Sequence, residues 1–305
     1  MKKESQKILV TGGSGFVGKT LQKTQPTWEY ISSSDCDLTD PKMTKELFSD
    51  LKPCAIVHLA ARVGGIKDNV ENQADFYYAN TMMNTNVIHQ AHCSGVERVL
   101  SSLSTCAFPD IVPSFPFTEE EFFNGPPTIT NFAYGMTKRM LQVSSMAYRK
   151  QYGRNYSTFC PSNLYGPGDN FNKESSHFVA ALVRKIASAK DGDVVELWGT
   201  GKPLRQQLYV DDLCDIIPIL LKNHNSYMPI VVAPNENYSI LEMAMFLMKH
   251  SGKDITISFN GKLDGQFRKD GCNRRLTEII ESFEFTKFKD GIKKTYNWYL
   301  ENINE

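Results

Sequence analysis

The sequence predicts an α/β protein with a Rossmann-like, doubly wound parallel sheet and a smaller α/β C-terminal substrate domain. Three observations predict this fold. Short runs of β-branched and apolar residues alternate with helical patterns through the first half of the chain, which is typical of a parallel sheet covered by helices. A glycine-rich loop follows the first of these runs. The alternation then ends in a stretch rich in Gly, Pro and Asn at 161–172.

The first predicted strand, Lys7–Thr11, leads through the loop Gly12-Gly13-Ser14-Gly15-Phe16-Val17-Gly18 into a predicted helix. Glycines permit a tight turn and the close approach of a ligand, and free N–H groups at a helix start favour a pyrophosphate. The alternative is a glycine-rich turn without a ligand. The candidate cofactor-binding residues of this loop are Gly12, Gly15, Phe16, Val17 and Gly18.

The second predicted strand, 28–32, ends in serines, where an NAD-preferring site carries an acidic residue for the ribose 2′-hydroxyl. Ser33 and its neighbours leave room for a 2′-phosphate and could hydrogen-bond it, which favours NADP(H), although no arginine accompanies them and Asp35 follows slightly later. We expect Asp40 to cap the next helix. Asp37 and Leu38 could contact the adenine, or simply cap and pack.

The third predicted strand, 55–59, is followed by the small residues Ala60 and Ala61, which again let a ligand approach the backbone. A long helix is expected from Asp75 to Gly95. The fourth strand, 98–103, is followed at once by Ser104. Because open α/β sheets bind ligands outside the carboxyl ends of their strands, we expect Ser104 at the ligand-binding edge.

Tyr134 and Lys138 are four residues apart, so on a helix both side chains lie on one face. An ammonium near a phenol favours the phenolate, and a tyrosine tuned in this way can give or take a proton near neutral pH. Many ordinary helices contain the same spacing by chance. Gly153 is a natural end for this helix. Its expected buried stripe comprises Met136, Met140, Val143 and Ala147.

The second half of the chain is expected to return to the main sheet. After a fifth strand at 156–160, β runs at 194–198 and 206–210 flank a turn, and Asp211 or Asp212 is expected to cap another helix. The run 229–233 is expected to rejoin the sheet. We therefore predict a dinucleotide-binding domain over 1–166, with a segment near 206–234 rejoining it, and a mainly substrate-binding domain over 167–305.

Composition excludes several classes of protein. The 305 residues carry 34 basic and 34 acidic side chains, whereas a protein dedicated to nucleic acid needs a basic excess. No apolar run approaches the length of a membrane span, and the first residues lack the apolar core of a signal peptide. The seven scattered cysteines include no Cys-x-x-Cys pair, so neither a disulfide framework nor a structural zinc site is expected. We expect a cytoplasmic enzyme without a metal.

Taken together, these signals resemble the extended short-chain dehydrogenase/reductase family. The matching motifs are Gly12-x-x-Gly15-x-x-Gly18, His58-Leu59-Ala60-Ala61, Ser104, Tyr134-x-x-x-Lys138 and Tyr165-Gly166-Pro167. The resemblance implies that Tyr134 is the proton donor or acceptor and that Ser104 hydrogen-bonds the reacting oxygen. It implies that Lys138 lowers the pKa of Tyr134 and holds the nicotinamide ribose.

Further motifs resemble members of this family that act on GDP-sugars, over nearly the whole chain. These motifs are Val63-Gly64-Gly65-Ile66, Ser104-Thr105-Cys106-Ala107-Phe108-Pro109, 165–171, Trp198-Gly199-Thr200-Gly201 with Arg205, and Asp264-Gly265-Gln266-Phe267-Arg268-Lys269. The resemblance implies that GDP-4-keto-6-deoxy-D-mannose is inverted at C3 and C5 and then reduced at C4 with NADPH. Ser14 stands where some relatives place a basic side chain for the 2′-phosphate, so the preference for NADP(H) is inferred partly from the family.

The resemblance also assigns roles to single residues. Cys106 and His177 occupy the positions of the epimerisation base and acid, and His177 also lies among the cofactor-binding positions. A thiol is a useful base only when its pKa is lowered, which a nearby cation could do. Members commonly form homodimers through a four-helix bundle that includes the helix bearing Tyr-x-x-x-Lys. The candidate substrate-binding residues are Asn163, Arg184, Lys185, Trp198, Arg205 and Lys269.

Two other readings remain open from the residues. One is another nucleotide-sugar enzyme of the same fold: a 4-epimerase, which would not need Cys106 and His177, or a 4,6-dehydratase, which would usually carry Asp-Glu where this chain has Thr105-Cys106. The other is a non-catalytic dinucleotide sensor, which the presence of both Tyr134 and Lys138 disfavours.

Overall fold

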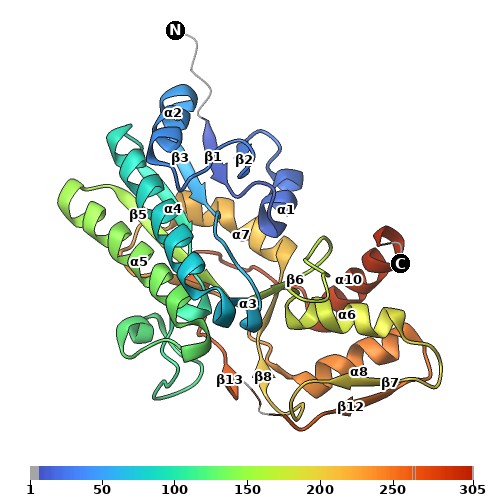
Figure 1. Cartoon of the computed structure of the whole chain (residues 1–305). Helices are drawn as coiled ribbons and strands as arrows, with labels where there is room; N and C mark the ends of the chain where they lie inside the picture. Colours follow the sequence, from blue (N-terminus) through green and yellow to red (C-terminus); the bar gives the residue numbers. More distant parts are fainter. Residues whose placement is uncertain (1–6, 263, 265, 304–305) are drawn as a thin grey trace.

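The computed structural model describes residues 7–262, 264 and 266–303, and for Ile66 and Lys67 it describes the backbone alone. The expectation that the first residues lack a signal peptide concerns residues outside this description. The motif positions at Gly265 and at the Ile66 side chain also lie outside it. Figure 1 shows two parts, one built on a large sheet and the other containing the last helix and a small sheet.

The large sheet has six strands in the order β10-β5-β4-β3-β1-β2, and every neighbouring pair is parallel. The chain places β2 on one side of β1 and β3 on the other, so the ends of β1 and β3 form the point where the strand order reverses. This confirms the predicted fold. The strands are β1 (Ile8–Thr11), β2 (Glu29–Ile31), β3 (Ala55–His58), β4 (Arg98–Ser102), β5 (Asn155–Pro161) and β10 (Ile230–Val232).

Helices cover both faces of this sheet (Figure 1). On one face α1 (Phe16–Thr24) packs beside α7 (Val210–Asn223), over a core that includes Leu21 and Leu213. On the other face lie α2 (Pro41–Leu51), α4 (Gln73–Cys93) and α5 (Phe132–Tyr152), and the last two run side by side. The apolar strand residues are therefore buried from both sides, which explains their lack of alternation.

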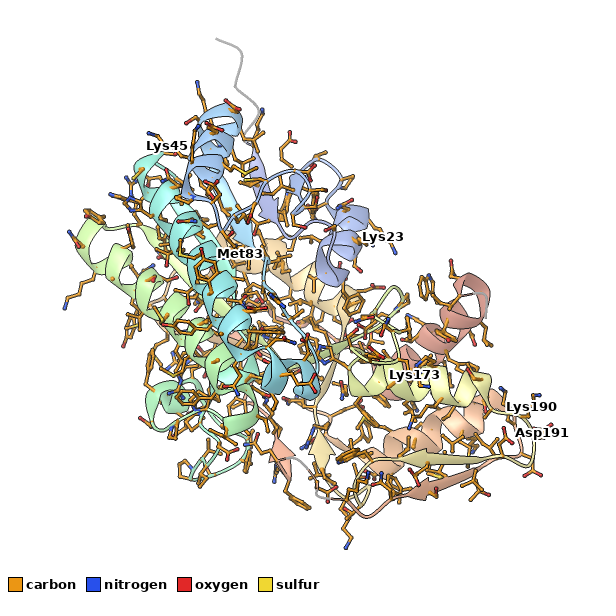
Figure 2. All side chains as sticks on the ribbon, viewed as in Figure 1. Lys23, Lys45, Met83, Lys173, Lys190 and Asp191 are labelled. Carbon is orange, nitrogen blue, oxygen red and sulfur yellow. The ribbon has the colours of Figure 1, made fainter. Side chains whose placement is uncertain are left out.

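The other part has its own apolar core between helices and a small sheet. Its parallel pair β7 and β12 packs with three helices, and Figure 2 shows Lys190 and Asp191 in the turn between α6 and β7, at the edge of the molecule. A three-stranded sheet in the order β11-β8-β13 and the pair β6-β9 complete the strands. The bounds are β6 (Asn163–Tyr165), α6 (Phe178–Ser188), β7 (Val194–Leu197), β8 (Leu204–Arg205), β9 (Gln207–Tyr209), β11 (Tyr238–Ser239), α8 (Ile240–Ser251), β12 (Thr256–Phe259), β13 (Arg268–Lys269) and α10 (Phe288–Asn302).

Short helices complete the described chain, and they connect the longer elements near the strand ends. They are α3 (Ile66–Glu71), η1 (Thr105–Ala107), η2 (Glu119–Phe123), η3 (Ile129–Asn131) and α9 (Arg274–Thr277). Within residues 7–262, 264 and 266–303, none of the helices has the length and apolarity needed to cross a membrane.

Two predicted helix boundaries are confirmed. The Asp40 carboxylate accepts hydrogen bonds from the backbone N–H groups of Lys42 and Met43 at the start of α2. Gly153, with φ of 69°, ends α5 in the left-handed conformation.

Two other predictions are wrong. Tyr209 is the residue that precedes α7, whereas Asp211 and Asp212 lie in its first turn. The buried Asp212 carboxylate instead accepts hydrogen bonds from the backbone N–H and the hydroxyl of Thr286, at 2.8 and 2.7 Å. The buried stripe of α5 is also not the predicted one, because Met136 is half-buried and Met140, Val143 and Ala147 are exposed. Its buried face contains Gly135, Lys138, Leu141, Gln142 and Ser145.

Candidate active site

The glycine loop lies at the point where the strand order reverses. Gly12 has φ of 77°, and a Cβ at this position would lie 2.8 Å from the backbone nitrogen of Ala60. A Cβ on Gly18 would overlap the carbonyl oxygen of Gly12. Glycine is therefore required at both positions for α1 and the end of β3 to pack against the loop. Gly15 is exposed and directly precedes α1, and its own N–H donates to the Gly12 carbonyl oxygen at 3.0 Å. The N–H groups of the first helical turn have no partner within the helix.

A hollow of about 270 Å³ lies between this loop and the end of β2. Lys19 on α1 lines it. A cation was sought beside the serines after β2, and Lys19 instead follows the glycine motif. The Asp35 carboxylate accepts hydrogen bonds from the backbone N–H and the hydroxyl of Ser32, at 2.8 and 2.6 Å. These bonds lower the pKa of Asp35. The lining residues are Gly13, Ser14, Lys19, Gln22, Tyr30, Ile31, Ser32 and Asp35.

The other candidates for the adenosine end of the cofactor lie in the turn after β2. Ser33 is exposed and is absent from the residues that line the hollow. The Asp37 carboxylate accepts hydrogen bonds from the backbone N–H and the hydroxyl of Thr39, so it stabilises the turn. Leu38 is buried in the core under the sheet. A role of Asp37 and Leu38 at the adenine stays a prediction.

Ser104 and Cys106 lie together just beyond the end of β4. The Ser104 hydroxyl oxygen accepts a hydrogen bond from the Cys106 backbone N–H at 3.2 Å and so caps η1. Two side chains from distant segments donate to the Cys106 sulfur. Lys269 Nζ on β13 lies 3.4 Å from Cys106 Sγ, and Asn131 Nδ2 in η3 lies 3.3 Å from it.

This environment lowers the pKa of the Cys106 thiol. Burial raises that pKa, but the charge of Lys269 and the hydrogen bonds from Ser104, Lys269 and Asn131 outweigh the burial. A thiolate next to a cation is the reactive form of cysteine. Asn131 was not among the predicted site residues, and the resemblance placed Lys269 among the candidates for binding the substrate.

The first turns of α5 bring Tyr134 to the same place. A Cβ on Gly135 would lie 2.5 Å from the Cys106 carbonyl oxygen, so α5 can approach η1 this closely only because residue 135 is glycine. Burial raises the pKa of Tyr134, and the nearby Cys106 raises it further. A hydrogen bond with Ser104 opposes them without reversing the shift. The structure thus brings Ser104, Cys106, Tyr134 and Lys269 together.

Lys138 points past the tyrosine toward the sheet. Its Nζ donates a hydrogen bond to the Ser102 carbonyl oxygen at 2.8 Å and lies 5.8 Å from the centre of the Tyr134 ring. Burial lowers the pKa of Lys138 to about 8. We expected Lys138 to lower the pKa of Tyr134, but in this structure burial raises it instead. The partner of Lys138 is a backbone carbonyl at the end of β4.

The remaining predicted site residues lie on other elements than Ser104, Cys106 and Tyr134. His177 directly precedes α6, next to a segment that approaches Gly65, and desolvation lowers its pKa. Asn163 is half-buried on β6, and Ala60 and Ala61 follow β3. Arg205 is opposite Lys269 in the β8–β13 pair.

Arg184 and Lys185 line a hollow whose lining residues do not include Cys106. This second hollow, of about 390 Å³, lies between α6 and β7, and Lys185 Nζ donates to the Glu196 carbonyl oxygen at 2.6 Å. Trp198, just after β7, is largely exposed, with Lys262 Nζ 4.9 Å from its ring centre. Their roles in substrate binding stay predictions.

Comparison with known proteins decides the relationship. Residues 8–233 match the NAD dependent epimerase/dehydratase family. The chain belongs to this epimerase/dehydratase family. A probable GDP-L-fucose synthase of Drosophila melanogaster is 36% identical to this chain, with 98% of this chain and 99% of the relative covered. A GDP-L-fucose synthase of Dictyostelium discoideum is 35% identical, with 97% and 95% covered.

A solved family member has the same fold. The crystal structure of a GDP-L-fucose synthetase from Naegleria fowleri bound to NADP matches with a TM-score of 0.91 and 34% identity, covering 98% of this chain and 93% of that chain. The epimerase/dehydratase relationship therefore extends through the C-terminal part that carries Lys269.

Proposed function

We propose that this chain synthesises GDP-L-fucose from GDP-4-keto-6-deoxy-D-mannose. It inverts C3 and C5 of the sugar and then reduces the C4 ketone with NADPH. The observation that carries the proposal is the full-length relationship to GDP-L-fucose synthases. The grouping of Ser104, Cys106 and Tyr134 beyond the end of β4 supports it, because an epimerase-reductase needs a base and a proton donor at one ketone.

The residues present fit NADP(H). The packing at Gly12 and Gly18 leaves the backbone N–H groups at the start of α1 available to a pyrophosphate. Lys19 supplies a cation for the 2′-phosphate to the hollow beside β2, which the Asp35 carboxylate also lines. Gly15, Phe16, Val17, Ala60 and Ala61 follow the same two strand ends. When bound, NADPH supplies the hydride for C4.

Epimerisation uses the acidity of the hydrogens next to the C4 ketone. In this proposal the Cys106 thiolate removes a proton from one face, and the negative charge moves to the ketone oxygen. Ser104 and Tyr134 hydrogen-bond that oxygen and stabilise the enolate. His177 returns a proton to the opposite face. The thiol then loses its proton to water and the histidine regains one, so both groups are reset for the next carbon.

Reduction uses the same tyrosine. Tyr134 donates its phenolic proton to the C4 oxygen while that carbon is reduced. Its raised pKa keeps it protonated before this step. Lys138 holds a charge near the nicotinamide ribose, and its lowered pKa of about 8 makes that charge titratable near neutral pH. Asn163, Arg205, Trp198, Arg184 and Lys185 are proposed to hold the GDP-sugar.

The proposal includes a homodimer in the cytoplasm. Its structural support is the apolar outer face of α4 and α5, two helices that run side by side (Figure 1). Tyr78 is 62% exposed on α4 and Val143 is 52% exposed on α5. Such a face suits the four-helix interface implied by the resemblance.

The first experiment supplies GDP-4-keto-6-deoxymannose and NADPH, follows the loss of NADPH absorbance and identifies the sugar product. We expect GDP-L-fucose. Tyr134→Phe should reduce the rate of reduction by about 10²–10⁴-fold. Cys106→Ser should instead block the exchange of C3 and C5 hydrogens with deuterated water.

Two outcomes would contradict parts of the proposal. No NADPH oxidation with this sugar would favour another nucleotide-sugar epimerase, dehydratase or reductase of the family. GDP-L-fucose formed by Cys106→Ser at the parent rate would show that Cys106 is not the base.

A further inference from the structure

The cation that contacts Cys106 comes from a strand far away in the sequence. Lys269 Nζ lies 3.4 Å from Cys106 Sγ, and Asn131 Nδ2 lies 3.3 Å from the same sulfur. Lys269 is the second residue of β13, which pairs with β8 and places Lys269 opposite Arg205. The contact therefore depends on the small three-stranded sheet, which lies beside the end of β4 and η1.

The local structure holds Lys269 toward the cysteine. Side chains alternate along an extended segment, so the side chains of residues 268 and 270 point away from that of residue 269. On their side, the Arg268 guanidinium forms an ion pair with the Asp270 carboxylate, with Nε–Oδ1 and Nη2–Oδ2 distances of 2.6 and 2.9 Å. The Asp270 carbonyl oxygen also accepts a hydrogen bond from the Phe117 N–H at 2.9 Å. These three hydrogen bonds fix the strand, and Lys269 is left facing Cys106.

Among the described residues, Lys269 is the charged side chain that contacts this sulfur. Tyr134 on α5 and Cys160 on β5 are titratable groups near this sulfur, and burial raises the pKa of each, so both are neutral at pH 7. The Arg205 guanidinium, on the strand beside Lys269, donates to the Leu204 carbonyl oxygen at 2.8 Å. The Lys138 ammonium donates to the Ser102 carbonyl oxygen instead. Lys269 is thus the cation with direct access to Cys106.

We propose that Lys269 is a positioning residue that holds Cys106 in its thiolate form and thereby sets the pH range of epimerisation. This inference rests on the proposed function, and it gives Lys269 a role other than the expected contact with the GDP moiety. An ammonium next to the sulfur stabilises the thiolate relative to the thiol, while the Asn131 amide adds a neutral donor. When the thiolate takes a proton from the sugar, the negative charge passes to the C4 oxygen and Lys269 stays protonated.

The test compares Lys269→Met with Lys269→Arg, and Lys289→Met on the exposed face of α10 is the matched control. The rate of Cys106 alkylation by iodoacetamide is measured against pH, without nucleotide. Mass spectrometry of the peptide that contains Cys106 is required, because Cys54 and Cys93 are also exposed free thiols.

In the parent protein and in Lys289→Met we expect the midpoint of alkylation below about 8.5, the ordinary pKa of a cysteine thiol. Lys269→Met should move the midpoint upward, with about tenfold less thiolate at pH 7 for each unit of change. Lys269→Arg should retain most of the parent behaviour. An unchanged midpoint in Lys269→Met would overturn the proposal.

A second readout separates this role from nucleotide binding and from misfolding. Deuterium exchange at C3 and C5 should fall in Lys269→Met at pH 7 and recover as the pH is raised. If Lys269 only binds the diphosphate, KM rises at every pH and the alkylation midpoint does not move. If the midpoint moves but the GDP-sugar is not turned over, the Lys269–Cys106 pair stands and the proposed function fails.

Discussion

His58 is a buried histidine that the fold keeps neutral at the end of β3. Its Nδ1 and Nε2 lie 2.7 Å from Thr11 Oγ1 and 3.1 Å from Asn84 Oδ1. Burial and the charge of Lys138 together lower its pKa to about 4, against the opposing effect of the hydrogen bond with Asn84. A charged imidazole would add a second cation beside Lys138 directly under the proposed cofactor site.

This histidine makes stability depend on pH. Between pH 6.5 and 4 the unfolded chain binds a proton that the native protein excludes, so the stabilising effect is complete above pH 6.5 and is lost as the pH falls toward 4. The difference is worth about 3 kcal/mol. We expect His58→Gln to lose less free energy of unfolding over this range than the parent, as measured by chemical denaturation.

The variant His250→Gln, at a half-buried histidine on α8, is the control, and it should follow the parent curve. Parallel curves for the parent and His58→Gln would contradict the assignment. Burial also lowers the pKa of His224 to about 4. His224 therefore keeps part of the pH dependence of stability in every variant.

At this scale the sequence predicted the groups of the site better than their partners. Ser104, Tyr134 and Lys138 could be inferred because strand order and helical spacing place them at one edge. The Lys269–Cys106 contact could not, because it depends on how β13 pairs with β8 and on how both dock beside η1. Lys19 was overlooked for a similar reason, since a helix side chain faces the hollow beside another strand.

The position of α5 depends on one glycine. A Cβ on Gly135 would meet the Cys106 carbonyl oxygen at 2.5 Å and the Pro127 side chain at 2.9 Å. Backbone on one side leaves little room to adjust, so an added methyl group must move the helix or η1.

Gly135→Ala should therefore lower the rate of GDP-L-fucose formation, by about 10²-fold for a displacement near 1 Å, although alanine favours helix formation. The measurement is steady-state turnover, together with the thermal midpoint. Ser144→Ala on the same helix is the control, and its activity should match the parent. Full activity in Gly135→Ala would show that the approach of α5 is not required.

The error in the stripe of α5 has a physical cause. Periodicity assumes that the buried face is apolar, but here the buried face is polar and bonded. Arg139 Nε donates to the Ala107 carbonyl oxygen and Gln142 Nε2 to that of Tyr227, each at 2.6 Å. The apolar side chains Met140 and Val143 consequently lie on the outer face.

For the whole molecule, this outer face leads to a prediction about assembly. If α4 and α5 form the dimer interface, Val143→Glu places a charge in an apolar contact and should convert the dimer to monomer. Light scattering after size exclusion measures the mass. Leu300→Glu on α10, 54% exposed at another surface, should leave the mass unchanged. An unaltered dimer in Val143→Glu would place the interface elsewhere.

The division of the chain at 166 stays a prediction, whereas the return to the sheet can be seen directly. Ile230 pairs with Phe159, so the sixth strand is added only after the chain has made β6 to α7. On the ribosome, β5 waits as an unpaired edge until residues 230–232 emerge, a delay of several seconds at about 5–20 residues per second. Unpaired edges template aggregation, so the nascent chain is prone to aggregate during this interval, and a chaperone that shields β5 during synthesis would raise the yield of folded enzyme.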